Sequence, residues 1–163
     1  MEATRKNTFI FFFNSVGHPF DRNTYSVLRE YCLKPNCASF LKEHVFDFQK
    51  AEVGDKAYYV LLHYWYKGIC AAGTLTELKE EDGHVYAEIE LKQMVDIEHC
   101  PILPLQKLED SIPEFDWRDA PNGSLLNEKD AALLDALWNE HISSLDKNEQ
   151  SVTDSPKDET KNI

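Results

Sequence analysis

Residues 53–78 read VGDKAYYVLLHYWYKGICAAGTLTEL, and the run from Ala57 to Tyr66 is strongly apolar and aromatic. Gly54 and the aspartate after it indicate a turn, because glycine supplies a positive φ and aspartate bonds nearby backbone. Gly68 interrupts the apolar run before it resumes. Two successive strands of a sheet are therefore predicted here. Gly73 lies inside the second strand and suits either a sharp bend of the sheet or the close approach of a ligand.

On the N-terminal side of this segment, one strand and two helices are expected. The continuous apolar run from Phe9 to Phe13 predicts a short strand buried on both faces. Thr24 to Leu33 has helical spacing, with Thr24 as the expected N-cap. A weaker helical pattern covers Ser39 to Val45.

On the C-terminal side, Glu81-Asp82-Gly83 indicates a tight turn between two strands. The strand after this turn alternates, so that one face is apolar and the other is polar. Its expected inward residues are Val85, Ala87, Ile89 and Leu91. An irregular stretch with several prolines follows, from Ile102 to Gly123.

A helix from about Glu128 to Ile142 closes the folded part of the sequence. Asn127 is a favourable N-cap, and leucines together with Trp138 form an apolar stripe expected to pack in the core. Residues 143–163 are polar and charged, which is typical of a disordered tail. We therefore expect one domain, residues 7–142, followed by that tail. The order of elements predicts an α+β fold with a curled or barrel-like, mostly antiparallel sheet, flanking helices and a C-terminal helix.

Composition excludes several classes of protein. The sequence is 42% hydrophobic and 28% charged, and no apolar run approaches the roughly 20 residues of a membrane span. The pattern of a secretory signal is not present, so a cytoplasmic protein with reduced cysteines is expected. The 4 cysteines lack CxxC spacing and the 6 histidines are scattered, so neither a metal nor a cofactor is predicted.

The net charge of −12 argues against phosphate binding, which relies on lysine and arginine. The distribution of charge softens this objection, because residues 1–60 hold 8 basic and 7 acidic residues, a net +1. Residues 61–142 hold 6 basic and 17 acidic residues, a net −11. A basic face is therefore expected only in the first third of the chain. The acidic surface elsewhere suits plain solubility or a protein partner.

Residues 53–59 (VGDKAYY) and 67–75 (KGICAAGTL) resemble the centre of the EVE-type PUA-like domains, which read roughly vGD.v.fy, a short gap and gI.g.G.v. The related ASCH domains share this pattern. The strand that ends in Asn14 resembles the opening strand of these domains, and residues 112–118 (IPEFDWR) resemble the closing segment of some relatives. The resemblance implies a PUA-like fold with a pocket that accepts a base, often a modified one, in DNA or RNA.

Such a pocket needs flat aromatic walls that stack on the base and cations that meet phosphate. The candidate binding residues are Tyr64, Trp65 and Trp117 as walls, Asn14 for the base edge, and Arg22, Arg29 and Lys67 for phosphate. Trp65 also suits a core position in a buried strand, and Trp117, between charged residues, is expected to be half exposed. Turn chemistry at a strand exit also explains Asn14.

The predicted function is a non-catalytic domain that recognises a base in DNA or RNA. The sequence contains no GxSxG, HExxH, Walker A or GxGxxG pattern, and no catalytic residue is predicted. One alternative is a small-molecule or protein-interaction module on the same fold, which the acidic surface favours. Another is a small ASCH-like amidohydrolase, for which Lys67, Thr74 and Glu77 are residues of the required types.

Overall fold

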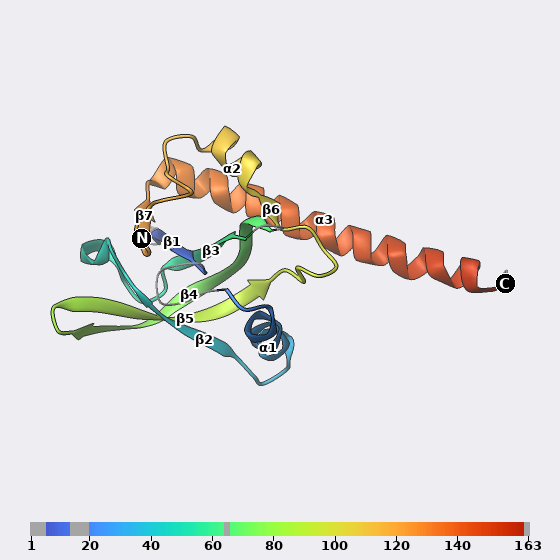
Figure 1. Cartoon of the computed structure of the whole chain (residues 1–163), viewed down its shortest axis with the longest axis horizontal. Coiled ribbons are helices and arrows are strands. Elements are labelled where there is room, and N and C mark those ends of the chain that lie inside the picture. The colour runs from blue at the N-terminus through green and yellow to red at the C-terminus, as the bar shows by residue number, and fades with distance from the viewer. Residues whose placement is uncertain (1–5, 14–19, 64–65, 162–163) are drawn as a thin grey trace, which may run out of the picture.

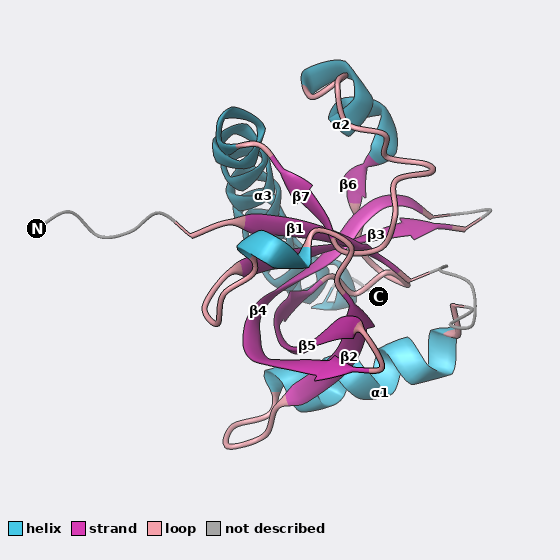
Figure 2. Cartoon of the chain, turned by 90° about the vertical axis from the view of Figure 1, so that its left-hand side faces the viewer, coloured by secondary structure: helices cyan, strands magenta, loops and turns pink. Residues whose placement is uncertain are grey.

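The computed structural model describes residues 6–13, 20–63 and 66–161, with side chains up to Asp146 (Figure 1). The elements in chain order are β1 (Thr8–Phe12), α1 (Arg22–Leu33), β2 (Ser39–His44), the 3-10 helix η1 (Phe48–Lys50), β3 (Lys56–Leu62), β4 (Lys67–Glu81), β5 (His84–Met94), β6 (Leu103–Pro104), α2 (Leu105–Ser111), β7 (Ser124–Leu126) and α3 (Glu128–Lys161). Helices lie around a central sheet (Figure 2). The predicted α+β class is confirmed.

The sheet has the order β2-β5-β4-β3-β1-β7, and β6 pairs with β4. β1 runs parallel to β3, and the other pairs of described strands are antiparallel. All five residues of β1 are buried between β3 and β7, as the apolar run predicted. The tight turn between β4 and β5 is also confirmed, since Asp82 and Gly83 both have positive φ. The prediction of a mostly antiparallel sheet is correct.

The sheet curls but does not close into a barrel (Figure 2). Its edge strands β2 and β7 are not paired with each other in a ladder. Loop hydrogen bonds span the gap, because Phe46 N donates to Asn122 O and Asp47 N donates to Gly123 O, both at 3.1 Å. Gly123 has a φ of 81°, and a Cβ there would lie 2.6 Å from Val45 Cα. A glycine is therefore needed where the two edges approach.

Gly73 marks the bend between β4 and β5. The register of these strands shifts between Ala72 and Gly73. A Cβ at Gly73 would lie 2.4 Å from the carbonyl oxygen of Glu90. The sequence left open a bend of the sheet or the close approach of a ligand. The register shift and the closeness of β5 account for this glycine without a ligand.

Two consecutive tyrosines of β3 point to opposite faces of the sheet. The Tyr58 hydroxyl donates to Asp135 Oδ1 at 2.5 Å, and the Tyr58 ring packs edge-on against Trp138 at 5.9 Å between centroids. The Tyr59 ring stacks on Phe13 on the other face, at 4.6 Å. Trp138 is 1% exposed, which confirms its predicted core position. α3 therefore covers one face, and Phe13 together with α1 covers the other.

The segment from Ser39 to Val45, predicted as a weak helix, contains strand β2 instead. β2 pairs with β5 over its whole length, so cross-strand hydrogen bonds override the local pattern. Its inward residues Ser39 and Glu43 are buried, whereas Phe40 is exposed. A short segment carries too little periodicity to distinguish a strand from a helix, which explains the error.

α1 begins two residues earlier than predicted, at Arg22. Asp21 rather than Thr24 is its N-cap, because the Asp21 carboxylate accepts a hydrogen bond from Thr24 N at 3.2 Å. The proline-rich stretch contains the short helix α2, which the sequence did not predict. The start of α1 differs because the Asp21 side-chain contact fixes that boundary, whereas α2 has no side-chain cap that the sequence could have signalled.

α3 begins where predicted and extends past its predicted end (Figure 1). Asn127 Oδ1 accepts a hydrogen bond from Asp130 N at 2.8 Å, which confirms the cap. The helix continues to Lys161 through the segment predicted to be a disordered tail, and Leu145 within it is buried. No glycine follows Ile142 to end the helix. No helix in the described part of the chain is long and apolar enough to cross a membrane.

Candidate functional site

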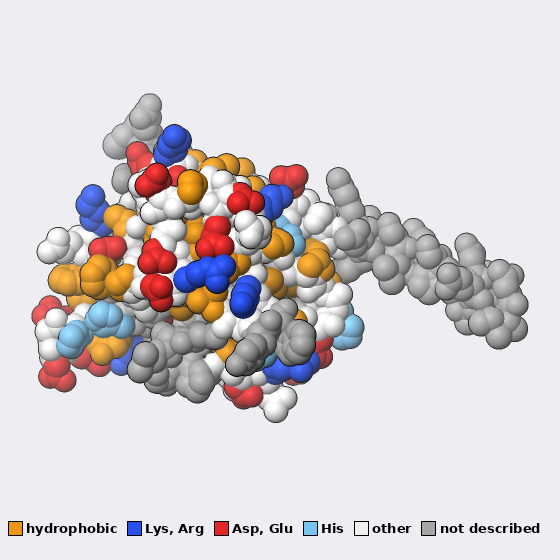
Figure 3. Space-filling model, turned by 45° about the horizontal axis from the view of Figure 1, so that its top comes forward, with side chains coloured by type: hydrophobic (Ala, Val, Ile, Leu, Met, Phe, Trp, Pro, Cys, Tyr) orange, Lys and Arg blue, Asp and Glu red, His pale blue; other side chains and the backbone are white. Residues whose placement is uncertain are grey.

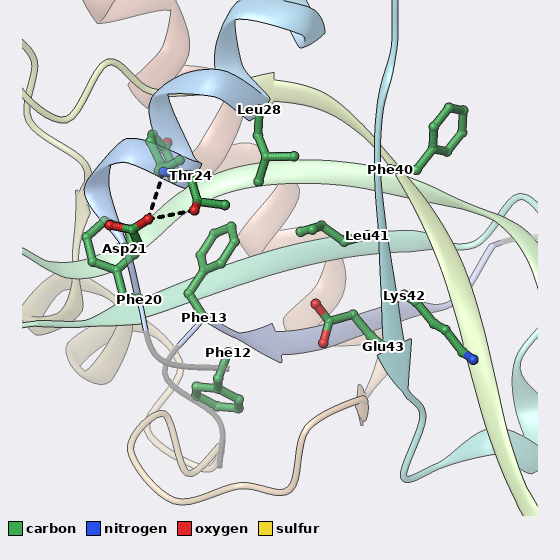
Figure 4. A pocket seen from close by; sticks show the side chains of 11 residues that line it. Phe12, Phe13, Phe20, Asp21, Thr24, Leu28, Phe40, Leu41, Lys42 and Glu43 are labelled. Carbon is green, nitrogen blue, oxygen red and sulfur yellow. Dashed lines mark hydrogen bonds between the residues drawn. The ribbon is translucent and has the colours of Figure 1, made fainter. Parts of the chain in front are cut away.

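A cavity of about 450 Å³ lies between the end of β1, the first half of α1 and strand β2 (Figure 4). This volume is within the range of small-molecule sites. The residues that line the cavity are Phe12, Phe13, Phe20, Asp21, Thr24, Tyr25, Leu28, Phe40, Leu41, Lys42 and Glu43. Five of these eleven side chains are aromatic, so we call this hollow the aromatic cavity.

Ring contacts hold the aromatic wall in place. Phe13 follows β1 directly, and its N–H still donates to Val60 O at 3.0 Å. Its ring stacks on Tyr59 at 4.6 Å with 28° between the planes. The rings of Tyr25 and Phe20 meet Phe13 edge-on, at 5.8 and 6.4 Å between centroids. Mutual edge-to-face packing therefore gives the cavity a wall of fixed shape.

A carboxylate forms the floor of the aromatic cavity. Glu43 of β2 is only 8% exposed. Its Oε2 accepts a hydrogen bond from the Tyr59 hydroxyl at 3.1 Å, and its Oε1 accepts one from Asn122 Nδ2 at 3.1 Å. Asn122 Oδ1 in turn accepts from Phe12 N at 2.7 Å. We call Glu43, Tyr59 and Asn122 the carboxylate floor, in which the tyrosine hydroxyl and the asparagine amide help to orient the carboxylate.

Burial also fixes the proton of the tyrosine in this floor. Desolvation first, and the Glu43 carboxylate second, raise the pKa of Tyr59 well above its ordinary value. The Tyr59 hydroxyl therefore keeps its proton at neutral pH and acts as a donor to Glu43.

The rim of the cavity adds further negative charge. The Asp21 carboxylate accepts from Thr24 Oγ1 at 2.6 Å, and this hydrogen bond lowers the pKa of Asp21. Lys42 Nζ is 3.1 Å from Glu81 and lies over the Tyr86 ring at 4.8 Å. Figure 4 shows its ammonium directed away from the aromatic side chains. The cavity thus combines aromatic faces with carboxylates.

Three of the predicted site residues, Asn14, Tyr64 and Trp65, lie outside the described residues. Trp117 is 1% exposed, so the expectation of a half-exposed side chain is wrong. Its indole N–H donates to Ile112 O at 3.0 Å, and its ring meets Phe115 edge-on. Trp117 is a core residue here, because a hydrogen bond satisfies its polar atom inside the apolar interior.

The predicted phosphate contacts are dispersed, and the aromatic cavity is not lined by them. Arg22 Nη2 is 3.0 Å from Glu98 Oε1, and Arg29 Nε donates to Met94 O at 3.0 Å. Lys67 is exposed at the start of β4. On the face shown in Figure 3, basic side chains are interspersed with acidic ones. The described residues therefore do not gather these three cations into one basic patch.

The residues suggested for an amidohydrolase do not converge either. Lys67, Thr74 and Glu77 follow one another along strand β4. Seven residues of strand separate the first two by about 23 Å at 3.3 Å per residue. Glu77 instead pairs with Lys79 at 3.3 Å. Among the described residues, no group of three or more potential metal ligands is found.

The sequence did not single out as binding residues the side chains that line the aromatic cavity, chiefly Phe13, Phe20 and Glu43, or Asn122, which donates to Glu43. One signal was available for Glu43. A strand over 39–44 places residues 39, 41 and 43 on one face, so a carboxylate would point inward. The helix prediction for this segment concealed that alternation.

Comparison with family models, with curated proteins and with solved structures finds no match for this chain. The resemblance to EVE-type domains therefore stays a prediction. The geometry of the aromatic cavity is the basis for assigning a function.

Proposed function

We propose that this chain is a non-catalytic, PUA-like domain of the EVE type that recognises a base of DNA or RNA, including a modified one, in the aromatic cavity. The observation that carries this proposal is a cavity with an aromatic wall and a single, nearly buried carboxylate in its floor. An aromatic wall stacks on any base, and a carboxylate accepts hydrogen bonds from a base edge.

The magnitudes support recognition of the base itself. Stacking on an aromatic side chain contributes about 1–3 kcal/mol per base. Extruding a base from a duplex costs a few kcal/mol, and a single strand avoids most of that cost. Phe13 and Phe20 are partly exposed at the cavity, and Figure 4 shows the Phe13 ring facing it. These rings are the expected stacking surfaces.

A second candidate function is the binding of a free small molecule that contains such a ring. The positions of the cations favour it, because Arg22 is paired with Glu98 and Lys42 with Glu81. Polymer binding needs phosphate contacts, whereas a free nucleoside needs none. Both candidate functions use the aromatic cavity. They differ in whether the protein also contacts phosphate groups outside it.

Calorimetric titration distinguishes these candidates. The full chain is titrated with nucleosides and with single-stranded five-nucleotide RNAs and DNAs, at about 50 and 200 mM salt. We expect Phe20→Ala to weaken binding about tenfold, because it removes one stacking surface. Phe48→Ala, an exposed aromatic outside the cavity, is the matched control and should bind like the wild type.

Each candidate function predicts a different result of this titration. Oligonucleotides that bind more tightly than nucleosides, with an affinity that falls with salt, support a nucleic-acid reader. Equal, salt-independent affinities support the small-molecule module. Absence of binding by a folded protein at low salt, for every base offered, contradicts both.

A further inference from the structure

The outer edge of strand β2 indicates how the cavity reads the base that it holds. Resting on the function proposed above, we propose that the base pairs through its Watson–Crick edge with the main chain of β2, where the C=O of Phe40 accepts and the N–H of Lys42 donates. Aromatic side chains stack on the base, and these backbone groups read its edge. Every residue carries such groups, so no motif in the sequence signals this recognition.

The pairing of β2 with β5 decides which backbone groups point outward. In an antiparallel pair, residues that exchange hydrogen bonds with the partner strand alternate with residues that direct both backbone groups away from it. Val45, directly after β2, donates its N–H to Val85 O at 3.0 Å, so it belongs to the first kind. The register is continuous along the whole of β2. Counting back in steps of two from Val45 passes over Lys42 and Phe40, which therefore direct their N–H and C=O groups away from β5.

A contact on the far side of β5 agrees with this assignment. Thr76 of β4 donates its hydroxyl to Glu88 O at 3.1 Å, so the Glu88 carbonyl faces β4. Glu88 is opposite Lys42 in the register of β2 and β5. A residue of β5 whose backbone faces β4 exchanges no hydrogen bond with β2, so Lys42 is again an outward position. Within the described part of the chain, no hydrogen bond takes up the outward backbone groups of Phe40 or Lys42.

This open edge borders the aromatic cavity. Four consecutive residues of β2 line the cavity, whereas one face of a strand would supply only every second residue. Figure 4 shows the side chains of Phe40 and Lys42 on the opposite side of β2 from the Phe13 ring. We infer that these two residues line the cavity with their backbone. Past the end of β2, the N–H of Phe46 donates to Asn122 O at 3.1 Å, so the edge is covered there and open beside the cavity.

The order of the outward groups matches the edge of a base. The Phe40 C=O and the Lys42 N–H follow each other on this edge, because the backbone of Leu41 between them faces β5. The Watson–Crick edge of each base likewise places a donor beside an acceptor. In uracil, the N3–H would donate to Phe40 O, and a neighbouring carbonyl would accept from Lys42 N–H. Two such bonds fix the Watson–Crick edge and leave the other edges of the base open to modification.

Two isomeric nucleosides test this proposal: 3-methyluridine and 5-methyluridine, each titrated into the full chain beside uridine. Both are uncharged and carry one added methyl group, but only 3-methyluridine lacks the N3–H. We expect 3-methyluridine to bind about tenfold more weakly than uridine, and 5-methyluridine to bind at least as tightly as uridine. Guanosine and 1-methylguanosine repeat the comparison on a purine.

The outcomes distinguish this proposal from the proposed function. If nucleosides bind and methylation of the ring N–H leaves their affinity unchanged, the pairing with β2 is wrong and base recognition still stands. If no nucleoside binds to the folded protein, base recognition by the cavity fails as well.

Lys42→Pro tests the backbone contact from the side of the protein, because proline has no N–H. Proline is tolerated on an edge strand where the missing N–H points outward, as it does at this position. Lys42→Ala is the matched control, because it loses the same pairing with Glu81 but retains the N–H. We expect Lys42→Pro to bind nucleosides about tenfold more weakly than Lys42→Ala. Equal affinities of the two folded variants contradict the proposal. If Lys42→Pro does not fold, the nucleoside series on the wild type still decides.

Discussion

Two buried tyrosines have nearly the same exposure and different partners. Tyr25 of α1 donates its hydroxyl to two backbone carbonyls, Val95 O at 2.7 Å and Cys70 O at 3.2 Å. Tyr59 of β3 donates instead to the Glu43 carboxylate. Every fold supplies carbonyl oxygens, whereas a carboxylate at the floor of a cavity costs free energy to bury. The first contact fixes a helix to the sheet, and the second holds a charge against an open hollow.

This difference separates structural polar contacts from those that favour a binding role. Apolar residues of similar size can replace a buried charged network with little loss of stability. The fold alone therefore does not require a carboxylate at Glu43. A charged group retained at that cost beside aromatic side chains is the arrangement expected of a binding site.

The largest expected effect comes from Asn122→Asp, which places a second carboxylate beside Glu43. The change removes the donor to Glu43 Oε1 and adds like-charge repulsion. We expect the free energy of unfolding to fall by about 3 kcal/mol at pH 7. Repulsion makes the folded variant take up a proton more readily than the unfolded chain, so the loss should shrink as pH falls from 7 to 5. Urea unfolding at both pH values measures this.

Asn127→Asp is the matched control for that substitution. Asn127 caps α3 at the surface, and aspartate and asparagine are about equally good N-caps. Its stability should stay within about 0.5 kcal/mol of the wild type. An Asn122→Asp protein as stable as the control would mean that Glu43 is not a charged acceptor. The difference drawn between Tyr25 and Tyr59 would then be wrong.

At alkaline pH, we expect the free energy of unfolding to fall because of buried groups such as Tyr25. Burial, and then the nearby Cys70, raise the pKa of Tyr25 far above its ordinary value of 10. Burial also raises the pKa of Cys70 to about 12 from 9.0. As pH rises, the unfolded chain loses these two protons before the folded chain does. The stability that they contribute is therefore complete below about pH 9 and declines above it. Each group steepens the decline by about 1.4 kcal/mol per pH unit above its ordinary pKa.

Tyr25→Phe isolates one of these groups. At pH 7 the variant should be about 1–3 kcal/mol less stable, because it removes the buried donor to Val95 O and Cys70 O. Between pH 10 and 11 the gap to the wild type should narrow by about 1 kcal/mol. Tyr59→Phe should show the same narrowing, because the pKa of Tyr59 is also raised. A gap that stays constant with pH would mean that these hydroxyls titrate normally in the folded protein.

The sequence predicted the parts of the fold that strong local patterns determine. Phe9 to Phe13 became the buried strand β1 because no polar residue interrupts the run. The turn at Asp82 and Gly83 was predictable because few residues adopt positive φ in succession. The cap at Asn127 was predictable because its side chain bonds backbone three residues away. Each of these signals lies within a few residues of the feature it determines.

The candidate site was not predictable in the same way, because its contacts are long-range. Glu43 and Asn122 are 79 residues apart in sequence, and Asn122 reaches Phe12 across 110 residues. Neither contact leaves a local pattern. Trp117 shows the converse error, because its charged neighbours suggested exposure while its hydrogen bond to Ile112 O places it in the core. Whether an aromatic side chain is buried depends on tertiary packing, which the charge of its neighbours in the sequence does not predict.

The smallest expected effect comes from Arg22→Gln, which bears on whether the cavity acts alone. Arg22 and Glu98 are both about half exposed, and such ion pairs contribute between 0 and 1 kcal/mol. We expect the free energy of unfolding to change by no more than about 0.5 kcal/mol. We also expect affinities for nucleosides and for oligonucleotides to remain unchanged, because the Arg22 guanidinium is already paired with Glu98. Calorimetry at about 50 mM salt measures both ligands.

Lys67→Gln is the companion variant, since Lys67 is also exposed and was also predicted to meet phosphate. If either variant weakens oligonucleotide binding and lowers its salt dependence by about one unit of slope, that cation contacts phosphate. The polymer would then be the ligand, with the cavity reading one of its bases. If neither variant changes binding, the affinity resides in the carboxylate floor and the aromatic wall. Recognition would then need no contribution from Arg22 of α1 or Lys67 of β4.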